Sequence, residues 1–245
     1  MTELPNSLSE AIAQSREATQ KALADGYTRL QVELVFPELK PLDVALQFLP
    51  LFEQYGDKLK VFFPDAGGAA LARRDWADVQ FQITDIGSGR AASLESKIQP
   101  EDEIFLFVAP TSVELPQLEK LCQAIGDRPL VLLIPRLEDA GAVGIGYTAR
   151  QTRERFISTI ESCYYLRPVD DDTAVIRCYP GLWEVWLQTN GNYEKITELP
   201  KKPSGDELDL ILIKGQPQTP GGETVPAKKT SVFKSLQRFF KALSS

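Results

Sequence analysis

Hydrophobic and polar positions along the first 136 residues alternate between a helical period and the continuous apolar runs of buried strands. Apolar residues recur at helical spacing from Leu8 to Leu23, and Gly26 closes this segment as a C-terminal cap. Strand-like runs follow over residues 30–36, 59–63, 79–86, 104–108 and 130–134. Helical patterns separate them over residues 42–55, 69–74 and 113–125. This alternation predicts an α/β fold with a Rossmann-like, mostly parallel, doubly wound sheet.

The pattern changes after Arg136. We expect a helix over residues 149–162, and then three short strands over residues 164–167, 174–179 and 183–188. The turns between these strands are short enough for an antiparallel hairpin region, which extends one edge of the sheet or forms a small subdomain. Residues 206–213 fit a final short helix or strand. The predicted α/β domain therefore covers residues 1–214.

A stretch rich in Gly, Pro, Gln and Thr over residues 215–227 predicts a flexible linker. It leads to a separate amphipathic helix within residues 228–245, for which Ser231 is the expected N-cap. Apolar residues form one stripe of this helix and basic residues lie opposite, as in helices that bind anionic lipid. The predicted membrane-binding residues are Val232, Phe233, Lys234, Leu236, Arg238, Phe239, Phe240, Lys241 and Leu243. A partner protein's groove and docking on the chain's own domain are the alternatives.

Charge is distributed unevenly along the chain. The net charge is −7, yet residues 224–245 hold five basic residues and no acidic one, which leaves 22 basic and 34 acidic residues before them. An acidic body argues against binding to nucleic acid, because neutralising phosphates requires a basic face. The sequence contains neither an apolar signal core nor a run of about 20 apolar residues. We expect a cytoplasmic protein that associates peripherally with an anionic membrane surface.

Composition also limits the chemistry. The chain has no histidine, which removes the commonest general base and the usual catalytic zinc ligand. Cys122, Cys163 and Cys178 are widely spaced and fit buried thiols in a reducing compartment. We therefore predict no catalytic residue, no metal site and no cofactor.

Two Gly-containing loops are candidates for binding an anionic ligand at the carboxyl ends of strands. The first contains Asp65, Gly67 and Gly68, where the alternative is a tight strand-to-helix turn that Asp65 caps. The second contains Gly144, Gly146, Arg150 and Arg153. Guanidinium groups and glycine amides suit an anion, but these glycines also suit a close crossing of backbone segments. Trp183 and Trp186, in the hairpin region, are core residues or anchors of a protein interface.

Several segments together resemble a domain-of-unknown-function family of cyanobacteria and chloroplasts. They are Leu4-Pro5 with the first helix, residues 26–34, Leu71-Ala72-Arg73-Arg74-Asp75-Trp76, residues 143–156, Tyr164-Tyr165-Leu166-Arg167-Pro168 and Tyr179-Pro180-Gly181-Leu182-Trp183. The resemblance runs over roughly residues 4–213. Members of this family include a chloroplast factor named for low photosystem II accumulation, and the same domain is appended to a chloroplast adenylate kinase.

The resemblance implies a non-enzymatic role in assembly or maintenance of the photosynthetic apparatus at the thylakoid membrane, with a photosystem subunit or assembly protein as partner. It supplies no catalytic residue. One departure is Ile134-Pro135, where the family pattern leads us to expect Asn-Pro. The alternatives are a binding domain or an enzyme that acts on a nucleotide or phosphometabolite, and a scaffold unrelated to photosynthesis.

Overall fold

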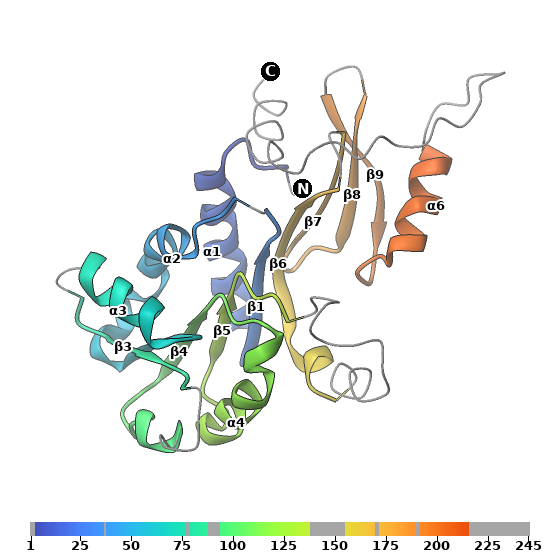
Figure 1. Ribbon diagram of the computed structural model, residues 1–245. Helices are drawn as coiled ribbons and strands as arrows, with labels where there is room; N and C mark the ends of the chain where they lie inside the picture. Colours follow the sequence, from blue (N-terminus) through green and yellow to red (C-terminus); the bar gives the residue numbers. More distant parts are fainter. Residues whose placement is uncertain are drawn as a thin grey trace.

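The computed structural model describes residues 3–36, 38–76, 79–87, 94–137, 155–169, 172–189 and 192–215. They form one nine-stranded mixed sheet with helices on both faces (Figure 1). The strand order is β3-β2-β4-β5-β1-β6-β7-β8-β9. The predicted α/β class is confirmed, as are the mostly parallel sheet and its antiparallel C-terminal strands.

Helix α1 (Leu8–Ala24) begins and ends where its polar caps require. The hydroxyl of Ser7 accepts a hydrogen bond from the Glu10 amide at 3.1 Å, which satisfies one of the free N–H groups of the first turn. Asp25 follows the last turn, and Gly26 has a positive φ of 89°, which glycine adopts without strain. The predicted first helix is confirmed.

Six strands make the parallel part of the sheet. They are β1 (Arg29–Leu34), β2 (Leu59–Phe63), β3 (Gln82–Asp85), β4 (Ile104–Val108), β5 (Leu130–Leu133) and β6 (Glu161–Pro168). Every residue of β2, β4 and β5 is buried, as their continuous apolar runs predict. Strand β1 lies between β5 and β6, so the C-terminal strands extend the same sheet.

Two helical predictions need correction. The segment predicted as one helix over residues 42–55 is a short helix α2 (Pro41–Phe48) followed by a 3₁₀ segment over Leu49–Lys58. Pro50 breaks the α-helical hydrogen bonding because it lacks an N–H. The helix predicted over residues 149–162 is wrong at its end, where Ile157–Thr159 forms a 3₁₀ turn and Glu161 already belongs to β6.

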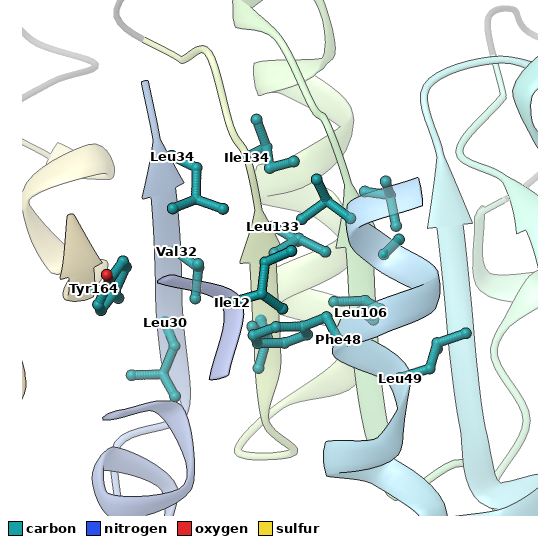
Figure 2. Close-up of a cluster of buried hydrophobic side chains, with 14 of the residues drawn as sticks. Ile12, Leu30, Val32, Leu34, Phe48, Leu49, Leu106, Leu133, Ile134 and Tyr164 are labelled. Carbon is teal, nitrogen blue, oxygen red and sulfur yellow. The ribbon is translucent and has the colours of Figure 1, made fainter. Parts of the chain in front are cut away.

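Helices cover the parallel strands on both faces. On one face, α1, α2 and α3 (Ala66–Asp75) pack against the sheet, and Figure 2 shows Ile12 and Phe48 among side chains of β1, β4 and β5. On the other face, α4 (Leu115–Ile125) packs against β4 and β5, together with Phe156 and Ile157. The carboxyl ends of the parallel strands lie at one edge between these two layers.

The antiparallel part continues from β6 through β7 (Thr173–Cys178), β8 (Trp183–Thr189) and β9 (Asn192–Leu199). Strand β9 was not predicted, because its sequence is mostly charged or polar and it forms the edge of the sheet. Helix α6 (Gly205–Gly215) covers one face of this region through Leu208, which lies with Tyr165 and Trp183 in a small third cluster (Figure 1).

Candidate functional site

The turn between β2 and α3 is a capped turn at the carboxyl edge of the sheet. The carboxylate of Asp65 accepts a hydrogen bond from the Gly68 amide at 3.0 Å. A Cβ added at Gly67 would lie 2.9 Å from this carboxylate, and one at Gly68 would lie 3.3 Å from the Phe63 ring. Both glycines therefore let the turn close tightly, and the cap expected at Asp65 is confirmed. The predicted ligand role of Asp65, Gly67 and Gly68 stays a prediction. Because the Asp65 carboxylate already occupies the helix N-terminus, an anionic ligand would have to compete with it.

The neighbouring strand β3 ends in a second carboxylate, which is already paired. The Lys97 ammonium donates to the Asp85 carboxylate at 3.2 Å and to the Asp85 carbonyl at 2.8 Å. Both side chains are mostly buried. This pair fastens the 3₁₀ turn over Leu94–Lys97 to the end of β3, so it has a structural role.

Strands β4 and β5 end in two matched turns that no sequence pattern predicted. Ala109 follows β4 with a φ of 52°, Ile134 follows β5 with a φ of 54°, and a proline follows each. The amide of Arg136 donates to the carbonyl of Pro110 at 2.7 Å, which ties one turn to the other. A left-handed conformation costs a non-glycine residue roughly 1–2 kcal/mol, and a β-branched residue such as isoleucine rarely adopts it.

Ile134 carries this backbone conformation inside the core. Asparagine adopts positive φ more readily than other side chains do. Ile134 is 3% exposed and lies beside Leu34 and Leu133 (Figure 2), so this chain offsets the backbone strain with apolar burial. Backbone strain of this kind is common at ligand-binding sites. The turns at the ends of β4 and β5 are therefore the best candidate for a ligand-binding site in the described residues.

Polar groups next to the two turns complete the candidate site. Thr111 and Glu114 form a capping box before α4, with the Thr111 amide donating to the Glu114 carboxylate at 2.8 Å. Arg136 lies beside Thr111 in an isolated parallel bridge, and its side chain is exposed. This edge therefore presents the exposed side chain of Arg136, while the Glu114 carboxylate is already held by the Thr111 amide and hydroxyl.

The second predicted loop lies outside the described residues. It contains Gly144, Gly146, Arg150 and Arg153. Residues 216–227 of the predicted linker and the whole segment 228–245 also lie outside the described residues. The described chain stops after Leu137, at the carboxyl edge, and resumes at Arg155, whose guanidinium binds the Glu119 carboxylate of α4 at 2.7 Å. The predicted anion site and the predicted membrane-binding residues stay predictions.

The tryptophan region has a structural role in the part that the structure describes. Trp183 is 4% exposed, and its ring lies 5.0 Å from the ring of Tyr165. The Lys202 ammonium lies 4.4 Å from the Tyr165 ring centre and binds the Glu33 carboxylate at 3.0 Å. These contacts hold the segment before α6 against the sheet. Trp183 is therefore a core residue, as one of the two interpretations predicts.

The cysteines are poor nucleophiles in this fold. Burial raises the pKa of all three thiols and brings that of Cys163 to about 12. The thiolate is the reactive form, so little of it is present near neutral pH. Within the described ranges no cluster of carboxylates and thiols could hold a metal ion. None of the helices described there is long and apolar enough to cross a membrane.

A comparison with protein-family models identifies the family of this chain. The family described as Domain of unknown function (DUF1995) matches residues 5–210, which extend from the segment before α1 into α6. The match covers all nine strands of the sheet and ends before the linker and the basic C-terminal segment. The chain therefore belongs to the family described as Domain of unknown function (DUF1995).

Proposed function

We propose that this protein is a non-enzymatic, peripheral membrane factor that supports photosystem assembly or maintenance, with photosystem II as the main client. The observation that carries the proposal is the division of charge along the chain. An acidic domain precedes a basic amphipathic segment that lies outside the family match at residues 5–210. The body contributes contacts to a protein partner, and the tail contributes the contact with lipid.

The tail supplies what the body lacks. An anionic membrane repels a domain with an excess of acidic residues, whereas each Lys or Arg near the surface contributes about 1 kcal/mol of attraction. The five basic residues of the tail and the apolar stripe between Val232 and Leu243 provide both components of interfacial binding. Binding through one short segment is reversible, which suits a factor that must leave its client after assembly.

The link to photosynthesis rests on the resemblance. The proposed relatives are the factor named for low photosystem II accumulation and the domain appended to a chloroplast adenylate kinase. We further propose that the parallel half of the sheet is Rossmann-like. Six neighbouring strands in the order β3-β2-β4-β5-β1-β6 run parallel between two layers of helices, and this arrangement supports the proposal. Strand β1 lies between β5 and β6 in this order. The proposed location is the cytoplasmic side of the thylakoid membrane.

Two measurements in cells test this proposal. Membranes are fractionated from cells that carry either the full chain or a chain ending at Gly222, and the proteins that co-purify with each are identified. We expect the full chain alone to follow thylakoid membranes and to bring photosystem subunits. Loss of the gene should lower the amount of photosystem II and change its assembly intermediates. Unchanged photosystem II after gene loss would reject the proposal.

A second candidate function is binding of a nucleotide or phosphometabolite at the carboxyl edge. The strained turns at Ala109 and Ile134 and the exposed Arg136 favour it. A thermal-shift screen with nucleotides and sugar phosphates tests it directly. A ligand present at 100 times its dissociation constant stabilises the folded state by about 2.7 kcal/mol. A shift that Arg136→Gln abolishes would support this candidate, and no shift with any compound would reject it for the ligands tested.

A further inference from the structure

Helix α6 carries apolar side chains on two opposite sides. Leu208 is 7% exposed and packs on the sheet, with Ile211 and Leu212 partly buried beside it. Leu210 and Ile213, in contrast, are 57% and 68% exposed. At about 100° per residue, these two side chains point away from the packed side. Figure 1 shows α6 at the margin of the molecule, next to β9. Its outer side therefore exposes two neighbouring apolar side chains.

The same outer side is acidic. Asp206 and Asp209 fall within about 100° of Leu210 and Ile213 around the helix axis, and both aspartates are exposed. Neither carboxylate has an ion-pair partner among the residues that the structure describes. We call these four residues the α6 outer face.

The position of Asp209 distinguishes this face from an ordinary helix start. The cap of α6 consists of Ser204 and Glu207, because the Glu207 carboxylate accepts from the Ser204 amide at 2.8 Å and the Ser204 hydroxyl accepts from the Glu207 amide at 3.3 Å. Asp206 lies in the first turn, where a carboxylate interacts favourably with the helix dipole. That effect fades beyond the first turn, so neither the cap nor the dipole explains the charge of Asp209 beside the exposed apolar pair.

An amphipathic helix with basic side chains beside its apolar stripe is complementary to this face. Apolar anchors at helical spacing and opposite charges next to them are what such recognition uses. An anionic lipid surface would repel the aspartates, and the same face of a second copy is acidic as well. Residues 231–243 of the chain do not fit either, since Lys234, Arg238 and Lys241 lie opposite their apolar stripe.

We propose that the α6 outer face binds an amphipathic helix of a partner protein, whose apolar side chains cover Leu210 and Ile213 and whose adjacent Lys or Arg side chains pair with Asp206 and Asp209. The 11 residues of α6 are about 16 Å long, so the complementary segment is a helix of about three turns. This surface deepens the proposed function and rests on it for the identity of the partner, a photosystem subunit or assembly protein. The binding of such a helix does not depend on that identity.

Two synthetic peptides of identical composition test this proposal on the full chain. Both are alanine-rich helices of about four turns with a leucine stripe, but the first carries its arginines beside the stripe and the second carries them opposite. By fluorescence anisotropy, the first peptide should bind about fivefold more tightly than the second, because only its arginines can form two exposed ion pairs while its leucines are covered. High salt should reduce this difference. Equal binding of the two peptides would overturn the proposal.

Substitutions then locate the binding site of the first peptide. D209K/I213S should weaken its binding by about tenfold, since it removes an apolar contact and reverses a charge. The matched control is D43K/L46S, which changes an exposed aspartate and a half-exposed leucine on α2 and should leave the binding unchanged. D206K/D209K should instead prefer a version of the first peptide with glutamate in place of arginine. The same loss of binding in D209K/I213S and in D43K/L46S would contradict a site on α6.

Two other occupants of this face would also overturn the proposal. A dimer in sedimentation equilibrium that D209K/I213S dissociates would mean that a second copy covers it. Binding of the first peptide to a chain ending at Gly222, without binding to the full chain, would mean that the C-terminal segment covers it.

The outcomes separate this inference from the proposed function. Specific binding of the first peptide, together with unchanged photosystem II after gene loss, would leave the docking surface intact and reject the photosystem role. Lowered photosystem II after gene loss, together with equal binding of the two peptides, would do the reverse.

Discussion

The buried ion pair between β2 and the start of β4 gives the sharpest test of the packing. The Lys60 ammonium lies 2.8 Å from the Asp102 carboxylate, and the two side chains are 1% and 4% exposed. Lys60 also donates to the Lys97 carbonyl at 2.6 Å, and Asp102 accepts from the Gln99 amide at 2.7 Å. Each charged group of the pair thus has a further hydrogen bond with the backbone, which helps a buried pair to be tolerated.

Removing one charge from this pair should be costly. D102N leaves the Lys60 ammonium buried without a counter-charge, and such changes cost about 3–5 kcal/mol. The remaining bond to the Lys97 carbonyl places the expected loss near the lower limit, at about 3 kcal/mol. K60M/D102N removes both charges, so its cost should fall well below the sum of the two single substitutions. Since domains have total stabilities of about 5–15 kcal/mol, the single variants should still fold.

Urea unfolding followed by tryptophan fluorescence measures these changes. The matched control is E103Q, which breaks the neighbouring pair of Glu103 with Lys58, whose side chains are 51% and 49% exposed. Water screens that pair, so its loss should not change the unfolding midpoint measurably. An unfolding midpoint of D102N equal to that of E103Q would contradict a role of this pair in the packing, as would a cost of K60M/D102N equal to the sum of the two single costs.

Three further predictions concern single residues. Ala109→Gly removes the strain of a left-handed alanine, whereas the control Ala124→Gly places a glycine in the exposed part of helix α4. In urea unfolding, the free energy of unfolding of Ala109→Gly should therefore be at least about 1 kcal/mol higher than that of Ala124→Gly. Asp65→Ala removes the α3 cap and should cost about 1 kcal/mol in the same assay, whereas a loss below 0.3 kcal/mol (roughly the error) would contradict the capping role. The pKa of Cys163 is raised to about 12 by burial, so its contribution to stability is complete below the unfolded thiol pKa near 9 and declines as the pH rises towards 12. At pH 8 a thiol reagent should therefore modify Cys163 only as fast as the protein unfolds, and rapid modification of the folded protein would contradict its burial.

Much of the parallel half of the sheet could be predicted from the sequence because its strands are apolar on both faces. The predicted bounds of β2 and β4 agree with the structure exactly in residues 59–63 and 104–108. Strand β9 escaped prediction because an edge strand needs few apolar residues. Of its residues, Ile196 and Leu199 pack against the third cluster. Residues 206–213 alternate in a way that fits either a strand or a helix. The Ser204 and Glu207 capping box is the local signal that would have decided for the helix.

The candidate site was less accessible to sequence reasoning. A cap at Asp65 follows from its position between a strand and a helix, and the structure confirms it. The turns at Ala109 and Ile134 could not be predicted, because neither residue type favours positive φ and the conformation is imposed by the sheet around them. A proline follows each of these residues, and it disfavours the right-handed helical conformation of the residue before it. This preference does not by itself predict a positive φ.

The central claim is that the basic C-terminal segment brings an acidic domain to the membrane. The most direct test is sedimentation of the full chain, and of a chain ending at Gly222, with vesicles of equal parts phosphatidylcholine and phosphatidylglycerol at low and at high salt. We expect only the full chain to sediment, and we expect salt to weaken its binding, because salt screens the attraction of the basic side chains to lipid. Equal sedimentation of the two chains, or of neither, would contradict it.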